Sequence, residues 1–265
     1  MANIEILVDS VSKINYSLIS NGKRVINFIR LINHDDRSYS NLKVSISFSF
    51  DFFKTYDFYV DFLDKEQTIE ENNILLNVNF EALYQVNEAI QGNIIVKIFE
   101  KENEEPIATL NKEVAILTFD EWGGASLGNE HLASFVLPND LAIKDVLKLS
   151  LNYLHKIDEK LDFFGYQTDK KEDVVNEVSA LFYALKSLNI SYCVPKASFE
   201  FSGQKVRLPS EILKTKLSTC LDSSLLFAGV LEACGLNPLV IVIDEHAFVV
   251  EKDGLNIMGR FEKHL

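Results

Sequence analysis

Two residues near the end of the chain carry side chains suited to nucleophilic chemistry, Cys220 and His246. The hydropathy pattern predicts a helix that begins at about residue 219, so Cys220 falls in its first turn. Unpaired backbone N–H groups and the positive end of the helix macrodipole gather there, and both favour a thiolate. The same amides can bind an oxyanion that develops on a carbonyl substrate. Cys220 is therefore the candidate catalytic nucleophile.

His246 follows Cys220 by 26 residues, after one predicted helix and one predicted strand. A helix antiparallel to the next strand returns the chain to its own N-terminus, so an imidazole that begins the following strand can lie beside Cys220. It would deprotonate the thiol and later protonate the leaving group. The alternative interpretation stays open, because a free cysteine is often a small buried hydrophobic residue. For Cys193 and Cys234 that packing role is the prediction, as it is for Tyr166 and Tyr192.

A complete triad needs a third group that orients the imidazole. Asp253 lies seven residues beyond His246, roughly 23 Å along a strand at about 3.3 Å per residue. A two-residue turn at Asp253-Gly254 would place apolar Phe261 opposite His246. Glu262 is one step further and faces the other side unless a bulge intervenes. The third residue is therefore left open, as Glu262 or as a residue beyond position 265.

The segments that must position Cys220 and His246 are predicted to be three helices followed by strands. The pair Asn139-Asp140 offers an N-cap for the first helix, Ser218 is the predicted N-cap of the third, and Gly235 follows the end of the third. The predicted helices span residues 141–154, 172–188 and 219–234, and the predicted strands span 239–243, 247–250 and, after the hairpin signal Asp253-Gly254, 255–261.

The first part of the chain has the periodicity of β-strands. Apolar and polar residues alternate without a break over residues 42–50, which indicates one buried and one exposed face. Further strands are predicted at 4–8, 25–32, 58–63, 74–80, 93–99 and 114–119, with a brief helix at 81–90. We therefore expect an α+β protein with two domains: an antiparallel β-sandwich of immunoglobulin type over residues 1–122, then a helix-plus-antiparallel-sheet domain over 123–265.

Composition narrows the classes of partner. The 265 residues are 47% hydrophobic and 25% charged, values typical of a globular protein. No run of 18 apolar residues predicts a membrane span. The net charge of −13 repels phosphate backbones, and there is no P-loop, so we expect a protein or peptide partner rather than direct nucleic-acid binding.

Cysteine usage predicts the compartment and the absence of a metal. Three cysteines, an odd number without a C-x-x-C pair, are typical of a reducing, cytoplasmic environment and argue against structural zinc. The first residues lack the basic and apolar regions of a secretory signal. No metal or cofactor is predicted.

A family resemblance is carried by three segments in order: Ser218-Thr219-Cys220-Leu221-Asp222, then Ala233-Cys234-Gly235-Leu236-Asn237-Pro238, then His246-Ala247-Phe248-Val249. They resemble the transglutaminase-like (papain-type) superfamily, with its G-x-C-x-D-x-A helix and H-A-[WF] strand. Upstream, Arg207-Leu208-Pro209 resembles the R-x-P element that precedes the cysteine. The match covers about residues 200–250, and Ser218 stands where glycine is usual. The resemblance implies Cys220 as nucleophile and His246 as its acid and base.

A second resemblance covers more of the chain. The segments Asp120-Glu121-Trp122-Gly123-Gly124 and 130–139, together with the Cys–His block, are similar to the N-terminal region of large bacterial superfamily 1 helicases with a restriction-endonuclease-like domain. This implies an accessory region of a DNA-processing or defence protein whose partner is a linked helicase motor.

Two functions follow as hypotheses. In the first, the chain is a thiol enzyme of the cysteine-peptidase or acyl-transfer class that acts on an amide carbonyl through Cys220 and His246. In the second, it is a non-catalytic interaction or autoinhibitory module with a degenerate site. The acidic surface favours the second, because it could occupy a basic DNA channel.

Overall fold

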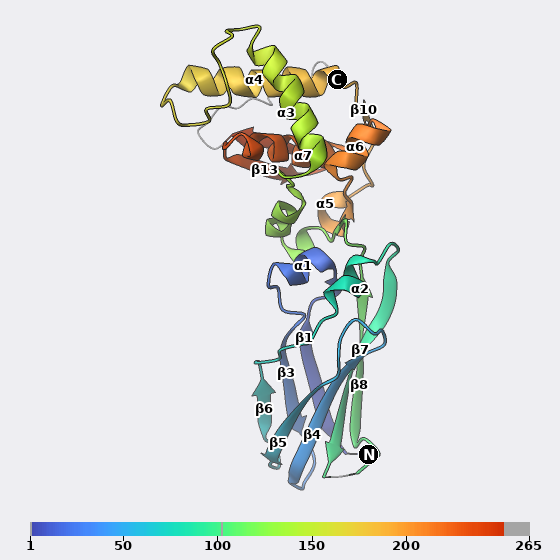
Figure 1. Cartoon of the computed structure of the whole chain (residues 1–265). Helices are drawn as coiled ribbons and strands as arrows, with labels where there is room; N and C mark the ends of the chain where they lie inside the picture. The colour runs from blue at the N-terminus through green and yellow to red at the C-terminus, as the bar shows by residue number, and fades with distance from the viewer. Residues whose placement is uncertain (1, 102, 252–265) are drawn as a thin grey trace. The chain divides into compact units, whose positions relative to one another are not determined.

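The computed structural model describes residues 2–101 and 103–251. They form a mixed α/β structure with two compact units, Met1–Phe119 and a second that begins at Asp120 (Figure 1). The predicted third C-terminal strand at 255–261, with Asp253 and Glu262, lies outside the described residues. Within the described residues, no helix is long and apolar enough to cross a membrane.

The first unit contains two sheets that contribute to one hydrophobic core. One has the order β2-β8-β7-β4-β5, antiparallel except where β2 runs parallel to β8, and the other has the order β1-β3-β6. The alternation predicted for residues 42–50 is confirmed over β4, where Leu42, Val44 and Ile46 are fully buried. The strands are β1 Ile4–Ser10, β2 Lys13–Ile14, β3 Ile26–Asn33, β4 Tyr39–Phe48, β5 Tyr56–Leu63, β6 Thr68–Glu71, β7 Ile90–Glu100 and β8 Ala108–Ile116.

Two predictions in this unit are wrong. Residues 74–80 form no strand: Val78 makes an isolated bridge to Phe53, and Asn79 accepts a hydrogen bond from Ala82 N at 3.1 Å and starts the short helix α2, Phe80–Tyr84. The predicted helix at 81–90 ends early, since β7 begins at Ile90. The pattern also missed β6, which has one apolar residue and no buried one, and the short helix α1, Tyr16–Ser20.

The second unit is built around α7, Cys220–Ala233, whose side chains are nearly all buried. Small residues such as Ala228 and Gly229 allow α3, Leu141–Leu154, to pack closely against it. α4, Lys171–Ser187, and the hairpin of β13, Pro238–Ile243, with β14, His246–Glu251, complete the core around α7. The predicted helices and the two strands within the described range are confirmed.

Short elements connect the main helices and strands of the second unit. β9, Glu121–Trp122, pairs with β11, Gln204–Lys205, so Trp122 belongs to the second unit. β10, Ser191–Tyr192, pairs in parallel with β12, Leu217–Ser218. The remaining pieces are the 3₁₀ helices η1 Ala125–Leu127 and η2 Asn129–Phe135 and the helices α5 Phe199–Ser202 and α6 Pro209–Thr215.

Candidate functional site

The N-terminus of α7 is closed by a reciprocal capping box. The Thr219 hydroxyl accepts from Asp222 N at 3.2 Å, and the Asp222 carboxylate accepts from Thr219 N at 2.9 Å. Thr219, and not the predicted Ser218, is therefore the N-cap. The spacing of Thr219 and Asp222 is the capping-box signature that the sequence already carried.

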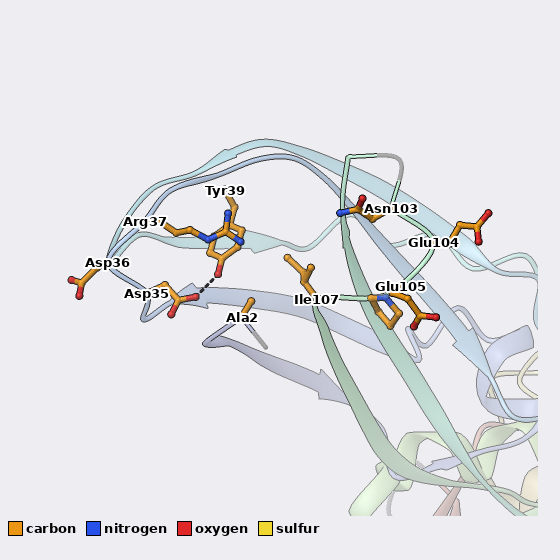
Figure 2. A pocket seen from close by; sticks show the side chains of 10 residues that line it. Ala2, Asp35, Asp36, Arg37, Tyr39, Asn103, Glu104, Glu105 and Ile107 are labelled. Atoms are coloured by element: carbon orange, nitrogen blue, oxygen red, sulfur yellow. Dashed lines mark hydrogen bonds between the residues drawn. The ribbon is translucent and has the colours of Figure 1, made fainter.

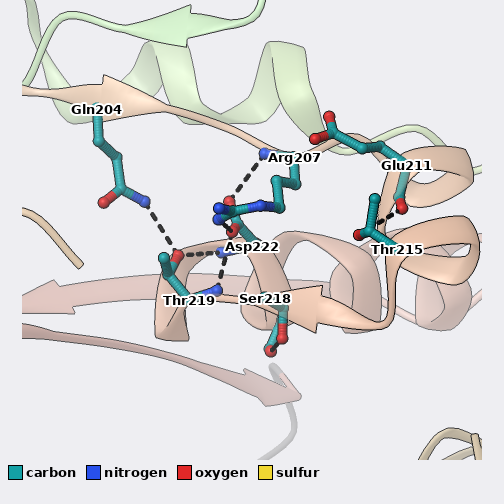
Figure 3. Close-up of polar contacts among 8 residues, drawn as sticks. Gln204, Arg207, Glu211, Thr215, Ser218, Thr219 and Asp222 are labelled. Atoms are coloured by element: carbon teal, nitrogen blue, oxygen red, sulfur yellow. Dashed lines mark hydrogen bonds and ion pairs between the residues drawn. The ribbon is translucent and has the colours of Figure 1, made fainter. Parts of the chain in front are cut away.

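Arg207 completes this network (Figure 3). Its backbone N–H donates to Asp222 Oδ1 at 2.9 Å, and its guanidinium Nη1 lies 3.0 Å from Oδ2. Gln204 Nε2 donates to the Thr219 hydroxyl at 3.1 Å. The Arg-x-Pro segment and the Cys-x-Asp segment thus meet in space. A consequence for Cys220 is that a buried carboxylate already occupies the positive end of α7, which weakens its support for a thiolate.

Cys220 is the first residue of α7 and is 5% exposed. Burial raises the pKa of its thiol, although the N–H groups of Ala247 and Leu221 and the Tyr192 hydroxyl donate hydrogen bonds that lower it. The thiol is therefore neutral near pH 7, contrary to the thiolate expected from helix position alone.

The β13–β14 hairpin explains why the N–H of Ala247 is available. A two-residue turn at Asp244-Glu245 joins the pair Ile243 and His246. The next opposed pair along such a ladder is not hydrogen-bonded, so the N–H of Ala247 points away from β13. The sulfur of Cys220 therefore lies at the edge of β14 that faces away from β13.

His246 has its backbone beside this thiol but directs its ring elsewhere. Ala247 and Val249 pack in the clusters that include α7, and successive strand side chains alternate between faces. The His246 ring consequently lies on the face away from α7, where it stacks near Phe248 with centroids 6.4 Å apart. Among the described residues, no hydrogen bond joins the imidazole to the Cys220 sulfur.

Tyr192 is a neighbour of the thiol that the sequence analysis assigned to packing only. Ser191 N donates to Lys216 O and Cys193 N donates to Ser218 O, both at 2.7 Å. This pairing holds Tyr192 next to the start of α7, and its hydroxyl donates to Cys220. Because the pairing joins segments 26 residues apart through a two-residue strand, no local sequence signal reveals it.

Of the two other cysteines, Cys234 agrees with the predicted packing role, and for Cys193 that role stays a prediction. Cys234 is buried in the main core of the second unit, and its pKa is raised to about 12 by burial and then by the charge of Glu177. Cys193 is half-buried, and all three thiols are free. Among residues 2–101 and 103–251, no three side chains of the metal-ligating types come together.

Two hollows of about 970 and 950 Å³ lie in the first unit and do not include Cys220. The first contains Asp35, Arg37 and Tyr39 (Figure 2). The Tyr39 hydroxyl donates to Asp35, and the Arg37 guanidinium lies 4.0 Å from the centre of the Tyr39 ring while it also binds Glu100. Asp35, Tyr39 and Arg37 therefore interact with one another inside the hollow.

Comparison with known proteins gives no family assignment, because no family model and no curated protein matches the chain. The transglutaminase-like resemblance stays a prediction.

Proposed function

We propose that this chain is a transglutaminase-like accessory module of a bacterial DNA-processing or defence helicase-type protein, and that it acts by binding protein and not by catalysis. In this proposal residues 1–122 are an immunoglobulin-like sandwich and the second domain keeps a degenerate Cys–His site. The observation that carries it is the state of Cys220: buried, with a raised thiol pKa and a histidine ring on the far face of β14.

The chemical reason is the scarcity of thiolate. An ordinary cysteine has a pKa of about 8.5, so only a few per cent is ionised at pH 7. Burial at Cys220 lowers that fraction further, and the imidazole that should remove the proton is turned away. A thiol in this state packs like a small apolar side chain.

The charge of the chain supports a protein partner. A net charge of −13 complements basic surfaces, and the DNA channel of a motor is such a surface. An acidic module docked there would compete with DNA and inhibit the motor until it is displaced.

The test is the alkylation of each cysteine by iodoacetamide between pH 6 and pH 10, followed by mass spectrometry of the intact, folded chain. We expect Cys220 to react more slowly than half-buried Cys193 at pH 7, with an apparent pKa above the ordinary value. Cys220→Ser identifies the Cys220 signal. Fast labelling of Cys220 at pH 7 that is lost in His246→Ala would contradict the proposal.

A second function, amide acyl transfer, is favoured by one observation. The N–H groups of Leu221 and Ala247 bond to the sulfur, so they lie beside the place where an oxyanion would form on a carbonyl attached to it. The thiolate would attack the amide carbon, the C–N bond would break, and the imidazolium of His246 would protonate the leaving amine before water cleaves the thioester. This requires the His246 ring to turn around the edge of β14. Release of amine from a peptide amide, abolished by Cys220→Ala, would establish it.

A further inference from the structure

The loop between α3 and α4 is held by one buried carboxylate. Glu177 Oε1 accepts from Phe164 N at 2.9 Å and from Gly165 N at 3.0 Å, and its Oε2 lies 3.2 Å from Gly165 N. Glu177 is on α4 and is 1% exposed. The loop is therefore tied to α4 through backbone groups that need this acceptor.

The same loop contacts the end of α7 and the hairpin. Gly165 has φ +55°, and a Cβ placed on it would lie 3.0 Å from Cys234 O. The next residue, Tyr166, donates its hydroxyl hydrogen to Glu251 on β14 and accepts from Asn237 N at 3.1 Å. Opening the loop would thus release contacts of α4, of α7 and of the hairpin that carries His246.

The electrostatic surroundings of Glu177 are unfavourable to its charge. The facing titratable groups are Asp173 on α4, Asp162 in the loop and Cys234 at the end of α7. No ion pair to Glu177 occurs among the described residues. Burial raises the pKa of Glu177 to about 7, although the two backbone donors lower it and the two aspartates raise it.

We propose that Glu177 and residues 161–167 form a pH-responsive latch that is closed in acid and loosens as the pH rises towards neutrality. This proposal does not depend on the function of Cys220. In the open loop the carboxyl is hydrated and ionises at its ordinary pKa, so each pH unit above that value favours opening about tenfold until the closed form also ionises. The contribution of the neutral Glu177 carboxyl to the stability of the closed loop is fully present below about pH 4.5 and is lost as the pH rises to about 7.

Hydrogen exchange of the intact chain tests the latch. The protection factors of Phe164 and Gly165, already corrected for intrinsic exchange, should fall about tenfold between pH 6 and pH 8. In Glu177→Gln the neutral amide still accepts from both N–H groups, so protection should be the same at both pH values. Glu172→Gln, at an exposed site on the same helix, is the matched control and should behave as the wild type.

Two outcomes would overturn the proposal: wild-type protection that does not change with pH, or a change of equal size in Glu177→Gln. Should Glu177→Gln not fold, Asp173→Asn takes its place. Removing that neighbouring charge lowers the pKa of Glu177 and should move the loss of protection to lower pH, and an unshifted midpoint would contradict the latch.

Discussion

The ion pair between Arg207 and Asp222 should be the strongest single support of the start of α7. Asp222 is fully buried and accepts from Thr219 N and from both the backbone and the guanidinium of Arg207. Each buried donor left without an acceptor costs about 1–3 kcal/mol. We therefore expect Asp222→Ala to lower the free energy of unfolding by about 3–5 kcal/mol. Arg207→Ala should lower it by about 2–3 kcal/mol, because its side chain is 33% exposed and water screens the remaining carboxylate.

A double-mutant cycle isolates the pair. Hydrogen bonds to charged groups contribute about 1.5–3 kcal/mol, and partial exposure of Arg207 reduces this, so the coupling between the two substitutions should be about 1–2 kcal/mol. Trp122 is the single tryptophan, is 1% exposed and packs in the same cluster as Cys220, so its fluorescence reports urea unfolding of the second unit.

The control is the exposed pair Arg30 and Glu70 in the first unit, which should couple by less than about 0.5 kcal/mol when unfolding is followed by circular dichroism. A coupling of Arg207 and Asp222 no larger than this control would refute the view that their ion pair holds the helix start.

Two further substitutions test contacts of the second unit. Tyr192→Phe should raise the pKa of Cys220, because the hydroxyl that stabilises the thiolate is lost, and an unchanged pH profile of alkylation would exclude that bond. Gly124→Ala should destabilise the second unit by more than about 2 kcal/mol, because φ is +83° and the new Cβ would lie 2.2 Å from Phe201 O. Gly22→Ala, with φ +78° but open space, should cost only about 1 kcal/mol in thermal or urea unfolding, and equal costs would refute the steric argument.

Local periodicity was enough to predict the main helices and the hairpin. α3 and α4 have continuous apolar stripes, and of the predicted pair Asn139-Asp140 it is Asp140 that caps α3, accepting from Ala142 N at 2.8 Å. The strand predicted at 74–80 is wrong: Val78 makes only an isolated bridge to Phe53 and Asn79 already caps a helix, and an alternating pattern registers neither feature. The secondary structure of such short segments depends on backbone sterics and on capping side chains, which the hydropathy periodicity does not report.

The candidate site was harder to predict from the sequence, because the direction of a strand side chain depends on which elements the strand packs against. Cys220 was placed correctly at the first turn of α7, and His246 at the start of β14. Which face His246 occupies follows only from the packing of Ala247 on α7. Glu177 did carry a signal, since it lies between Val174 and Val178 in the apolar stripe of α4, where a carboxylate must be buried.

Two buried carboxylates near the ends of α7 differ in the charges that surround them, and their expected roles differ accordingly. At the start, Asp222 has a guanidinium partner, so substituting Asp222 should lower the free energy of unfolding of the second unit. Beside the far end, Glu177 has backbone donors but faces aspartates, so its charge is opposed and its proton is exchangeable near neutrality. If a guanidinium were placed beside Glu177, for example by Asp173→Arg, the closed loop should keep its protection at pH 8. The presence of a cation beside a buried carboxylate would then decide whether its contacts in this unit depend on pH.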